Sequence, residues 1–154
     1  MDFSLIRGKQ QGDHVPNGYA GFNWENAYYI FDTYAKESYV LKGFLPAFTD
    51  SVKCVVYSGN GNPLSIYLPN ASNKFGVHSF SALSVYHDEM RVSVTGFRSN
   101  VPILTKQLVL NRGPPKLYQI DFEQIDKIIF TPTGIDVFTL KKLTLCLVLL
   151  NFML

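Results

Sequence analysis

The sequence predicts an all-β protein, an antiparallel β-sandwich of about eight strands in a single domain that spans residues 1–154. Apolar residues make up 47% and charged residues only 17%, so the bulk of the chain is not disordered. A high aromatic content (14%), with 11 Gly and 8 Pro, favours short strands joined by tight turns over long helices. Only residues 36–41 and 121–126 favour a helical turn.

Three segments in the second half of the chain alternate between apolar and polar residues, which is typical of half-buried strands. They are residues 91–97, 104–110 and 117–122. Residues 98–100 and 111–115 lie between them and are rich in Asn, Gly and Pro, the residues of tight turns. We therefore expect consecutive hairpins in an antiparallel meander.

Further strands are expected on both sides of this meander. Residues 53–57 and 64–68 flank a turn at 58–63 whose two glycines can adopt positive φ. Residues 127–131 and 138–148 are rich in Ile, Val, Leu and Thr. The spacing of these segments is close to the roughly 8–12 residues of a sandwich.

The C-terminal run LTLCLVLLNFML, residues 143–154, carries no charge. A bilayer-spanning helix needs about 20 apolar residues, so the run predicts no membrane span. We expect a final core strand followed by an apolar overhang at residues 149–154, which would be exposed unless a partner covers it.

The charge pattern argues against nucleic acid as a partner. Fourteen basic and twelve acidic residues give a formal charge of +2, and the basic residues are scattered. Nucleic-acid-binding proteins carry a clustered basic patch.

The Gly/aromatic run VPNGYAGFNW at residues 15–24 resembles the opening of an uncharacterised family of small extracellular β-sandwich domains. The family occurs in bacterial sorted surface proteins and in some eukaryotes. Further matches follow in the family's order over almost the whole chain: Asn26 and residues 61–63, 92–97, 113–114, 125–128 and 138–144.

This resemblance implies a jelly-roll sandwich similar to galactose-binding-like and carbohydrate-binding modules, and a secreted or cell-surface location. Two features depart from the family. Lys141 and Lys142 stand where the family tends to have an acidic pair, which argues against a structural calcium ion. The N-terminus lacks the apolar core of a secretory signal, so a cytoplasmic location stays open.

The Tyr- and Asn-rich residues 17–29, together with the turn at 58–62, supply the candidate ligand-binding residues. A sugar site combines an aromatic ring, which faces the apolar side of the pyranose, with amides or hydroxyls that fix its orientation. An alternative is that the segment packs at the sandwich edge, and we expect Trp24 in the core. The candidates are Asn17, Tyr19, Asn23, Asn26, Tyr28 and Asn60.

Asp2 and Asp136 are the candidate metal ligands, since the terminal strands of a sandwich can pair side by side. Calcium takes six to eight oxygen ligands, which two carboxylates do not supply. The sequence therefore predicts no cofactor.

Cys54 and Cys146 both fall in expected strands. They could form a disulfide if those strands are neighbours, or remain free and buried as small apolar residues. Asn70 begins the sequon Asn-Ala-Ser and is the glycosylation candidate if the protein is exported.

The sequence as a whole predicts a non-catalytic ligand-binding module, with a glycan or a protein surface as its partner. A structural or adhesive domain is the first alternative. A hydrolase is the second, and it would need two or three titratable groups that converge in a cleft. The ligand and the oligomeric state are not predicted.

Overall fold

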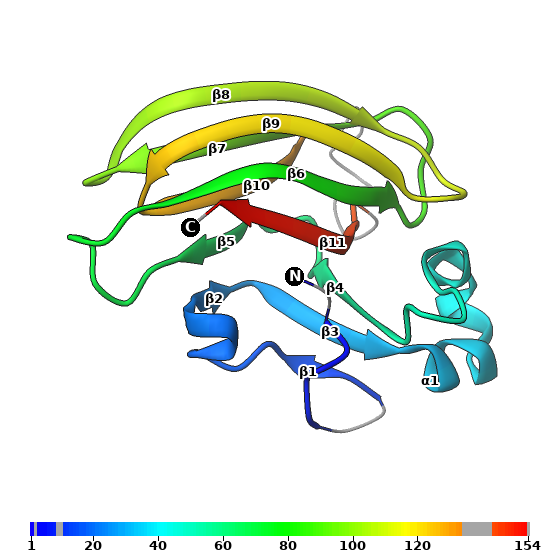
Figure 1. Cartoon of the computed structure of the whole chain (residues 1–154). Helices are drawn as coiled ribbons and strands as arrows, with labels where there is room; N and C mark the ends of the chain where they lie inside the picture. The colour runs from blue at the N-terminus through cyan, green and yellow to red at the C-terminus, as the bar shows by residue number, and fades with distance from the viewer. Residues whose placement is uncertain (2, 9–10, 134–142, 154) are drawn as a thin grey trace.

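A computed structural model describes residues 1, 3–8, 11–133 and 143–153. These residues form two antiparallel sheets that pack face to face (Figure 1). The first sheet has the order β1 (Asp13–His14), β3 (Ala27–Phe31), β4 (Cys54–Ser58), β11 (Leu145–Met153), β6 (Phe75–Ser84) and β9 (Lys116–Ile125). The second has the order β2 (Asn23–Glu25), β5 (Leu64–Tyr67), β10 (Lys127–Thr133), β7 (Met90–Arg98) and β8 (Val101–Leu110).

The antiparallel sandwich predicted from the sequence is confirmed, but the described residues form eleven strands rather than about eight. The expected strand ranges left out β6 and also β1, β2 and β3, of which the last three have only two, three and five residues. Strands this short give no clear alternation within a Gly-rich aromatic segment.

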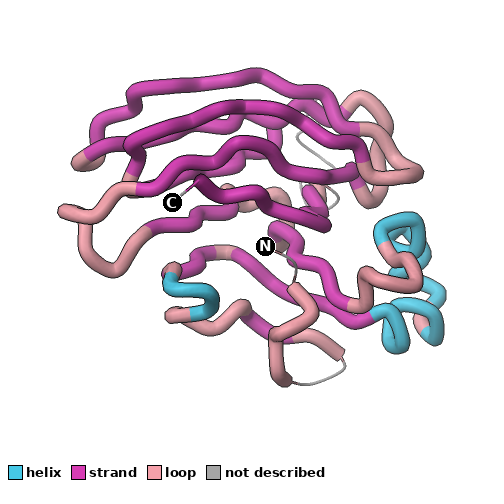
Figure 2. The backbone as a smooth tube through the Cα atoms, in the orientation of Figure 1, coloured by secondary structure: helices cyan, strands magenta, loops and turns pink. Residues whose placement is uncertain are grey.

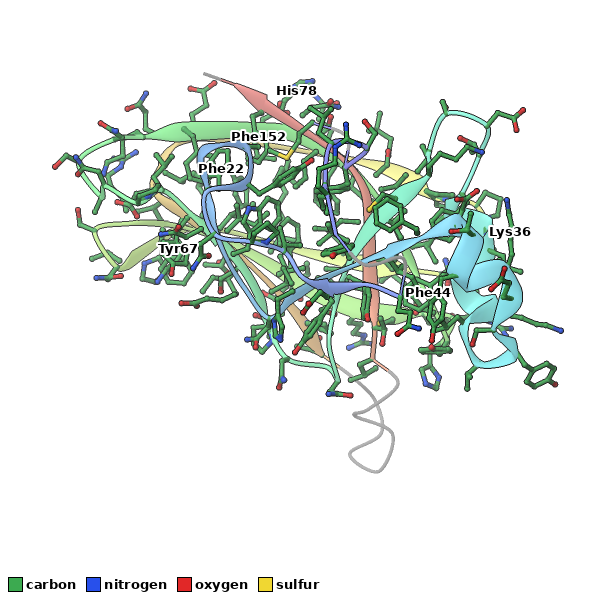
Figure 3. The ribbon with its side chains drawn as sticks, turned by 90° about the horizontal axis from the view of Figure 1, so that it is seen from below. Phe22, Lys36, Phe44, Tyr67, His78 and Phe152 are labelled. Atoms are coloured by element: carbon green, nitrogen blue, oxygen red, sulfur yellow. The ribbon has the colours of Figure 1, made fainter. Side chains whose placement is uncertain are left out.

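The main core lies between the sheets. Side chains of β7 alternate between buried and exposed as expected, with Val92 and Val94 fully buried. Trp24 is 5% exposed, so its predicted place in the core is confirmed. Phe22 and Phe152 stack with their ring centroids 4.6 Å apart, at the end of the sandwich away from Phe44 (Figure 3).

Strand β11 lies in the middle of the first sheet, between β4 and β6. Residues 149–153 are hydrogen-bonded to β6, and Leu150 is fully buried. The N-terminal amino group of Met1 also donates to the Leu150 carbonyl. Residues 149–153, predicted as an exposed overhang, instead continue β11 along β6, with Met1 bonded to Leu150; residue 154 lies outside the described residues.

A helical excursion covers part of the outer face of the first sheet. Helix α1 (Asp32–Glu37) and the 3-10 segment η2 (Tyr39–Ala47) lie together at one end of the sandwich (Figure 2). They bury a second apolar cluster that includes Ile30, Phe44, Val55, Cys146 and Val148. No helix within the described residues is both long and apolar enough to span a membrane.

The second predicted helical turn, at residues 121–126, is wrong. Residues 121–125 belong to β9, where Asp121 and Gln124 adopt positive φ. The pairing between β6 and β9 shifts register here, so the irregularity is of the β-bulge type. The strand still buries Phe122 and Ile125 in the core.

Candidate functional site

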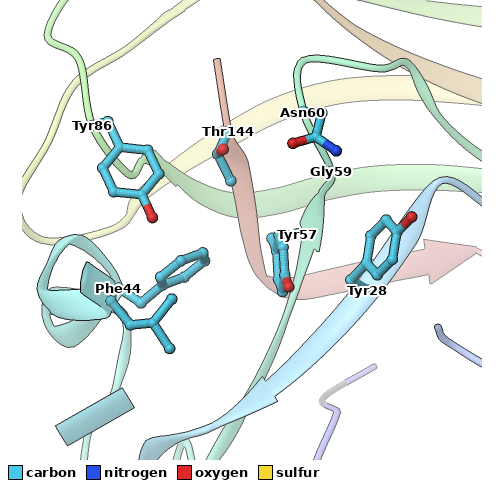
Figure 4. A pocket seen from close by; sticks show the side chains of 8 residues that line it. Tyr28, Phe44, Tyr57, Gly59, Asn60, Tyr86 and Thr144 are labelled. Atoms are coloured by element: carbon cyan, nitrogen blue, oxygen red, sulfur yellow. The ribbon is translucent and has the colours of Figure 1, made fainter. Parts of the chain in front are cut away.

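A hollow of about 270 Å³ opens on the outer face of the first sheet, beside the helical excursion (Figure 4). We call it the tyrosine pocket. Its walls come from β3, β4, η2, the turn after β4, and the segments that follow β6 and precede β11. The lining residues are Tyr28, Leu41, Phe44, Tyr57, Gly59, Asn60, Tyr86 and Thr144.

Strand register places the first two tyrosines. Tyr28 on β3 is the register partner of Tyr57 on β4, and both side chains point away from the inter-sheet core. Their rings stack with centroids 5.6 Å apart and planes 28° apart. Gly59 lies against the Tyr28 ring, where an added Cβ would come within 2.5 Å of ring carbon Cε2. The two rings thus form a fixed aromatic surface.

Phe44 joins this surface to the third tyrosine. Its buried ring meets Tyr57 edge to face at 5.0 Å and Tyr86 at 6.2 Å. Segment η2 can approach closely because Gly43 has no side chain: a Cβ there would lie 2.3 Å from the Val85 carbonyl oxygen. Segment η2 therefore packs directly against Val85, the residue that precedes Tyr86.

The pocket offers polar groups as well as rings. Among the described residues, the hydroxyls of Tyr28 and Tyr57 have no hydrogen-bond partner, and Tyr86 makes only a long bond of 3.4 Å to the Val40 carbonyl. Burial raises the pKa of Tyr57 and Tyr86, so both hydroxyls are protonated at neutral pH and can donate. Asn60 presents an exposed amide at the rim.

The structure brings only two of the six candidate ligand residues into this pocket, Tyr28 and Asn60. Asn17 accepts a 2.9 Å hydrogen bond from the Trp24 backbone N–H. Tyr19, in the short 3-10 segment η1 (Tyr19–Gly21), packs beside Trp24 and accepts a 3.1 Å bond from its indole N–H at its carbonyl. These two residues support the core.

The other two candidates lie at β2. Asn23 is opposite Tyr67 in the second sheet. Asn26 adopts a positive φ of 53° and donates a 2.9 Å hydrogen bond to the Pro63 carbonyl. Asn26 thus ties one turn to another, and neither residue lines the tyrosine pocket.

Both metal candidates, Asp2 and Asp136, lie outside the described residues. Over the part of the chain that is described, no three His, Cys, Asp or Glu side chains gather as a metal site. Asn70 is exposed in the turn after β5, where its side chain accepts a 2.9 Å bond from the Ser72 N–H.

Cys54 and Cys146 are both free and buried, so the possible disulfide is absent. Cys54 faces the inter-sheet core, whereas Cys146 belongs to the cluster beneath the helical excursion. The two side chains lie on opposite faces of one sheet, which explains why the thiols do not pair.

Sequence reasoning missed four aromatic or hydroxyl residues of the pocket, Phe44, Tyr57, Tyr86 and Thr144. Alternation along residues 53–57 could have placed Tyr57 on the face opposite Val56. The other three come from separate segments that only the sheet order and the docking of η2 bring together.

No family model and no curated protein matches this chain. Among solved structures, the chain is similar to TmCBM61, solved in complex with β-1,4-galactotriose. That likeness covers 90% of this chain and 94% of the other, at 8% sequence identity and a TM-score of 0.43.

Proposed function

We propose that this protein is a non-catalytic carbohydrate-binding module, and that its sugar binds in the tyrosine pocket. The observation that carries the proposal is the arrangement of three half-buried tyrosines around one hollow. Ring faces of this kind contact the C–H surface of a pyranose, while hydroxyl and amide groups at the rim fix its orientation. Tyr28, Tyr57 and Asn60 supply both kinds of group.

The lining of the pocket favours binding over hydrolysis. None of the eight described residues that line it is an Asp, Glu, His, Lys or Cys, so these residues provide no pair of groups for general acid–base catalysis. The half-buried rings also distinguish it from the flat, polar exterior expected of a purely structural domain. As part of the same proposal, the module acts outside the cell, where glycans are displayed.

The test is binding of the whole chain to a panel of oligosaccharides that includes β-1,4-galactotriose, followed by calorimetry with the best binder. Tyr57→Ala is expected to weaken affinity about tenfold or more, since roughly 1.4 kcal/mol corresponds to tenfold and a stacked ring contributes on this scale. Tyr67→Ala is the matched control, because Tyr67 is half-buried on the second sheet and does not line the pocket.

Unfolding in urea shows whether each variant is folded. Binding that is lost in Tyr57→Ala but kept in Tyr67→Ala supports the proposal. If no glycan binds, or if Tyr28→Ala and Tyr57→Ala both bind like the wild type, the proposal is wrong.

An adhesive role is the second candidate, favoured by the β8 edge. Val101, Leu104 and Val109 on β8 are 59%, 42% and 49% exposed, and the strand has a partner on one side only among the described residues. Exposed edges with apolar side chains mark protein contacts. The adhesive role is supported if the chain binds no glycan but associates through this edge. Sedimentation of the wild type and of Leu104→Lys measures that association.

A further inference from the structure

A second and larger hollow, which we call the basic groove, adjoins the tyrosine pocket. It has a volume of about 790 Å³, and Tyr86 lines both hollows. Segment η2 also faces both: Leu41 and Phe44 line the pocket, whereas Lys42 and Gly43 line the groove. Tyr86 and η2 therefore lie between the two hollows, and a ligand that fills both has to cross them.

The volumes indicate more than one sugar unit. Ligand sites for small molecules measure roughly 300–1,000 Å³. The tyrosine pocket, at about 270 Å³, lies just below this range, whereas the groove, at about 790 Å³, lies well within it.

The two basic residues that line the groove, Arg112 and Lys42, differ in whether a carboxylate neutralises them. Arg112 is neutralised by Asp88, to which its Nε and Nη2 donate at 3.2 and 3.0 Å and its backbone N–H at 3.0 Å. Hydrogen bonds from Arg112 lower the pKa of Asp88, so this carboxylate is ionised at neutral pH. Lys42 has no carboxylate within ion-pair distance among the described residues, and its ammonium lies 4.4 Å from the centre of the Tyr39 ring. Within the described part of the chain, the positive charge of Lys42 therefore has no counter-charge.

We infer that the ligand is an acidic oligosaccharide, with its neutral end in the tyrosine pocket and an anionic group, carboxylate or sulfate, beside Lys42 in the basic groove. This inference rests on the proposed function and names the class of its ligand. Tyr39 adds a ring that is 83% exposed beside the same ammonium, a second surface against which a sugar can stack. Lys42 selects by charge, and the tyrosine pocket supplies the contact area.

The experiment uses the full chain and three sets of oligosaccharides of two to six units: neutral, uronate-bearing and sulfate-bearing. Affinities are measured at low and high salt for the wild type, Lys42→Gln and Lys106→Gln. Lys106→Gln is the matched control, because it removes the same charge from the middle of β8, outside the groove. We expect Lys42→Gln to lose about two- to fivefold in affinity for acidic glycans only, as for an exposed ion pair.

The uronate and sulfate sets distinguish the two anionic groups. Preference for either acidic set, lost in Lys42→Gln and kept in Lys106→Gln, supports the inference. Equal binding of neutral and acidic sets, or equal loss in both lysine variants, overturns it while the proposed function stands. Binding to none of the three sets overturns the proposed function and this inference with it.

Discussion

Tyr28 and Tyr57 face each other across β3 and β4 and stack at 5.6 Å, on the side of the sheet that points away from the main core. The residues that flank Tyr57, Val56 and Ser58, point into the sandwich and are fully buried. The aromatic surface is therefore attached to a strand whose neighbouring residues are fixed in the core. A ligand that meets these rings finds them already in place, which limits the entropy lost on binding.

Gly59→Ala tests this placement. The new Cβ would lie 2.5 Å from Cε2 of the Tyr28 ring, so the ring must shift from its position beside Tyr57. We expect a loss of stability of about 1–3 kcal/mol, as for overpacking in a filled site, together with weaker glycan binding. Urea unfolding and calorimetry measure the two effects.

A double-mutant cycle provides the control. In Tyr28→Ala the ring is gone, so Gly59→Ala should then cost less than about 0.5 kcal/mol. An equal cost in both backgrounds would mean that the glycine is needed for its backbone and not for the contact with Tyr28.

Leu150→Ala tests the position of β11. Leu150 is fully buried opposite Phe80 in the first sheet, so removal of its side chain is expected to cost about 2–5 kcal/mol of unfolding free energy. Leu117→Ala is the matched control, because Leu117 is 65% exposed and should cost under about 0.5 kcal/mol. Similar costs at both positions would contradict a central β11.

Asp126 should make stability depend on pH. Its carboxylate is nearly buried and accepts from the Lys74 ammonium at 2.8 Å and from the Ser99 N–H at 2.7 Å. Burial alone would raise the pKa of Asp126, but these hydrogen bonds and the charge of Lys74 lower it below the ordinary 3.8. A lowered folded-state pKa stabilises the fold above the unfolded-state pKa of about 3.9, and this stabilisation is lost as the pH falls through the folded-state value.

We therefore expect Asp126→Asn to be less stable than the wild type by about 1–3 kcal/mol at pH 7, with the difference shrinking below about pH 4. Asp50→Asn, at an exposed position, should show neither effect. Unfolding measured from pH 7 to pH 2 checks this, and a difference that stays constant over the whole range would argue against the ionised Asp126 contact.

The two thiols should be inert in the folded protein. Burial raises the pKa of Cys54 to about 12 and also raises that of Cys146, and only a thiolate reacts readily with iodoacetamide. At pH 8 we expect no labelling of the native chain and labelling of both cysteines in urea, measured by mass spectrometry. Rapid labelling of the native protein would show that one thiol is accessible.

The sequence predicted strands best where one face of the strand is exposed to solvent. Alternation placed β7 correctly, with Val92 and Val94 inward. Alternation was no guide to β11, because a strand covered on both faces has no polar period. The strand expected at 138–148 was correct over 145–148, whereas residues 149–153 were wrongly placed outside it. Alternation also failed at residues 121–126, where two residues with positive φ interrupt the alternation of β9.

The candidate site was only partly predictable because it is assembled from segments distant in sequence. Tyr28 was found from its aromatic neighbourhood and Asn60 from its turn. Tyr86 and Thr144 reach the pocket through the ends of β6 and β11, whose neighbouring positions depend on the sheet order. No local pattern reports that order.

The central position of β11 also bears on how the protein is synthesised. Strands β4 and β6 share no hydrogen bonds with each other and meet only through residues 145–153. While the ribosome is still translating the preceding codons, both strands carry an open edge that can pair with other nascent chains. The sheet can therefore close only after residues 145–153 have been synthesised, and ribosome stalling shortly before codon 145 should leave an aggregation-prone chain that chaperones retain.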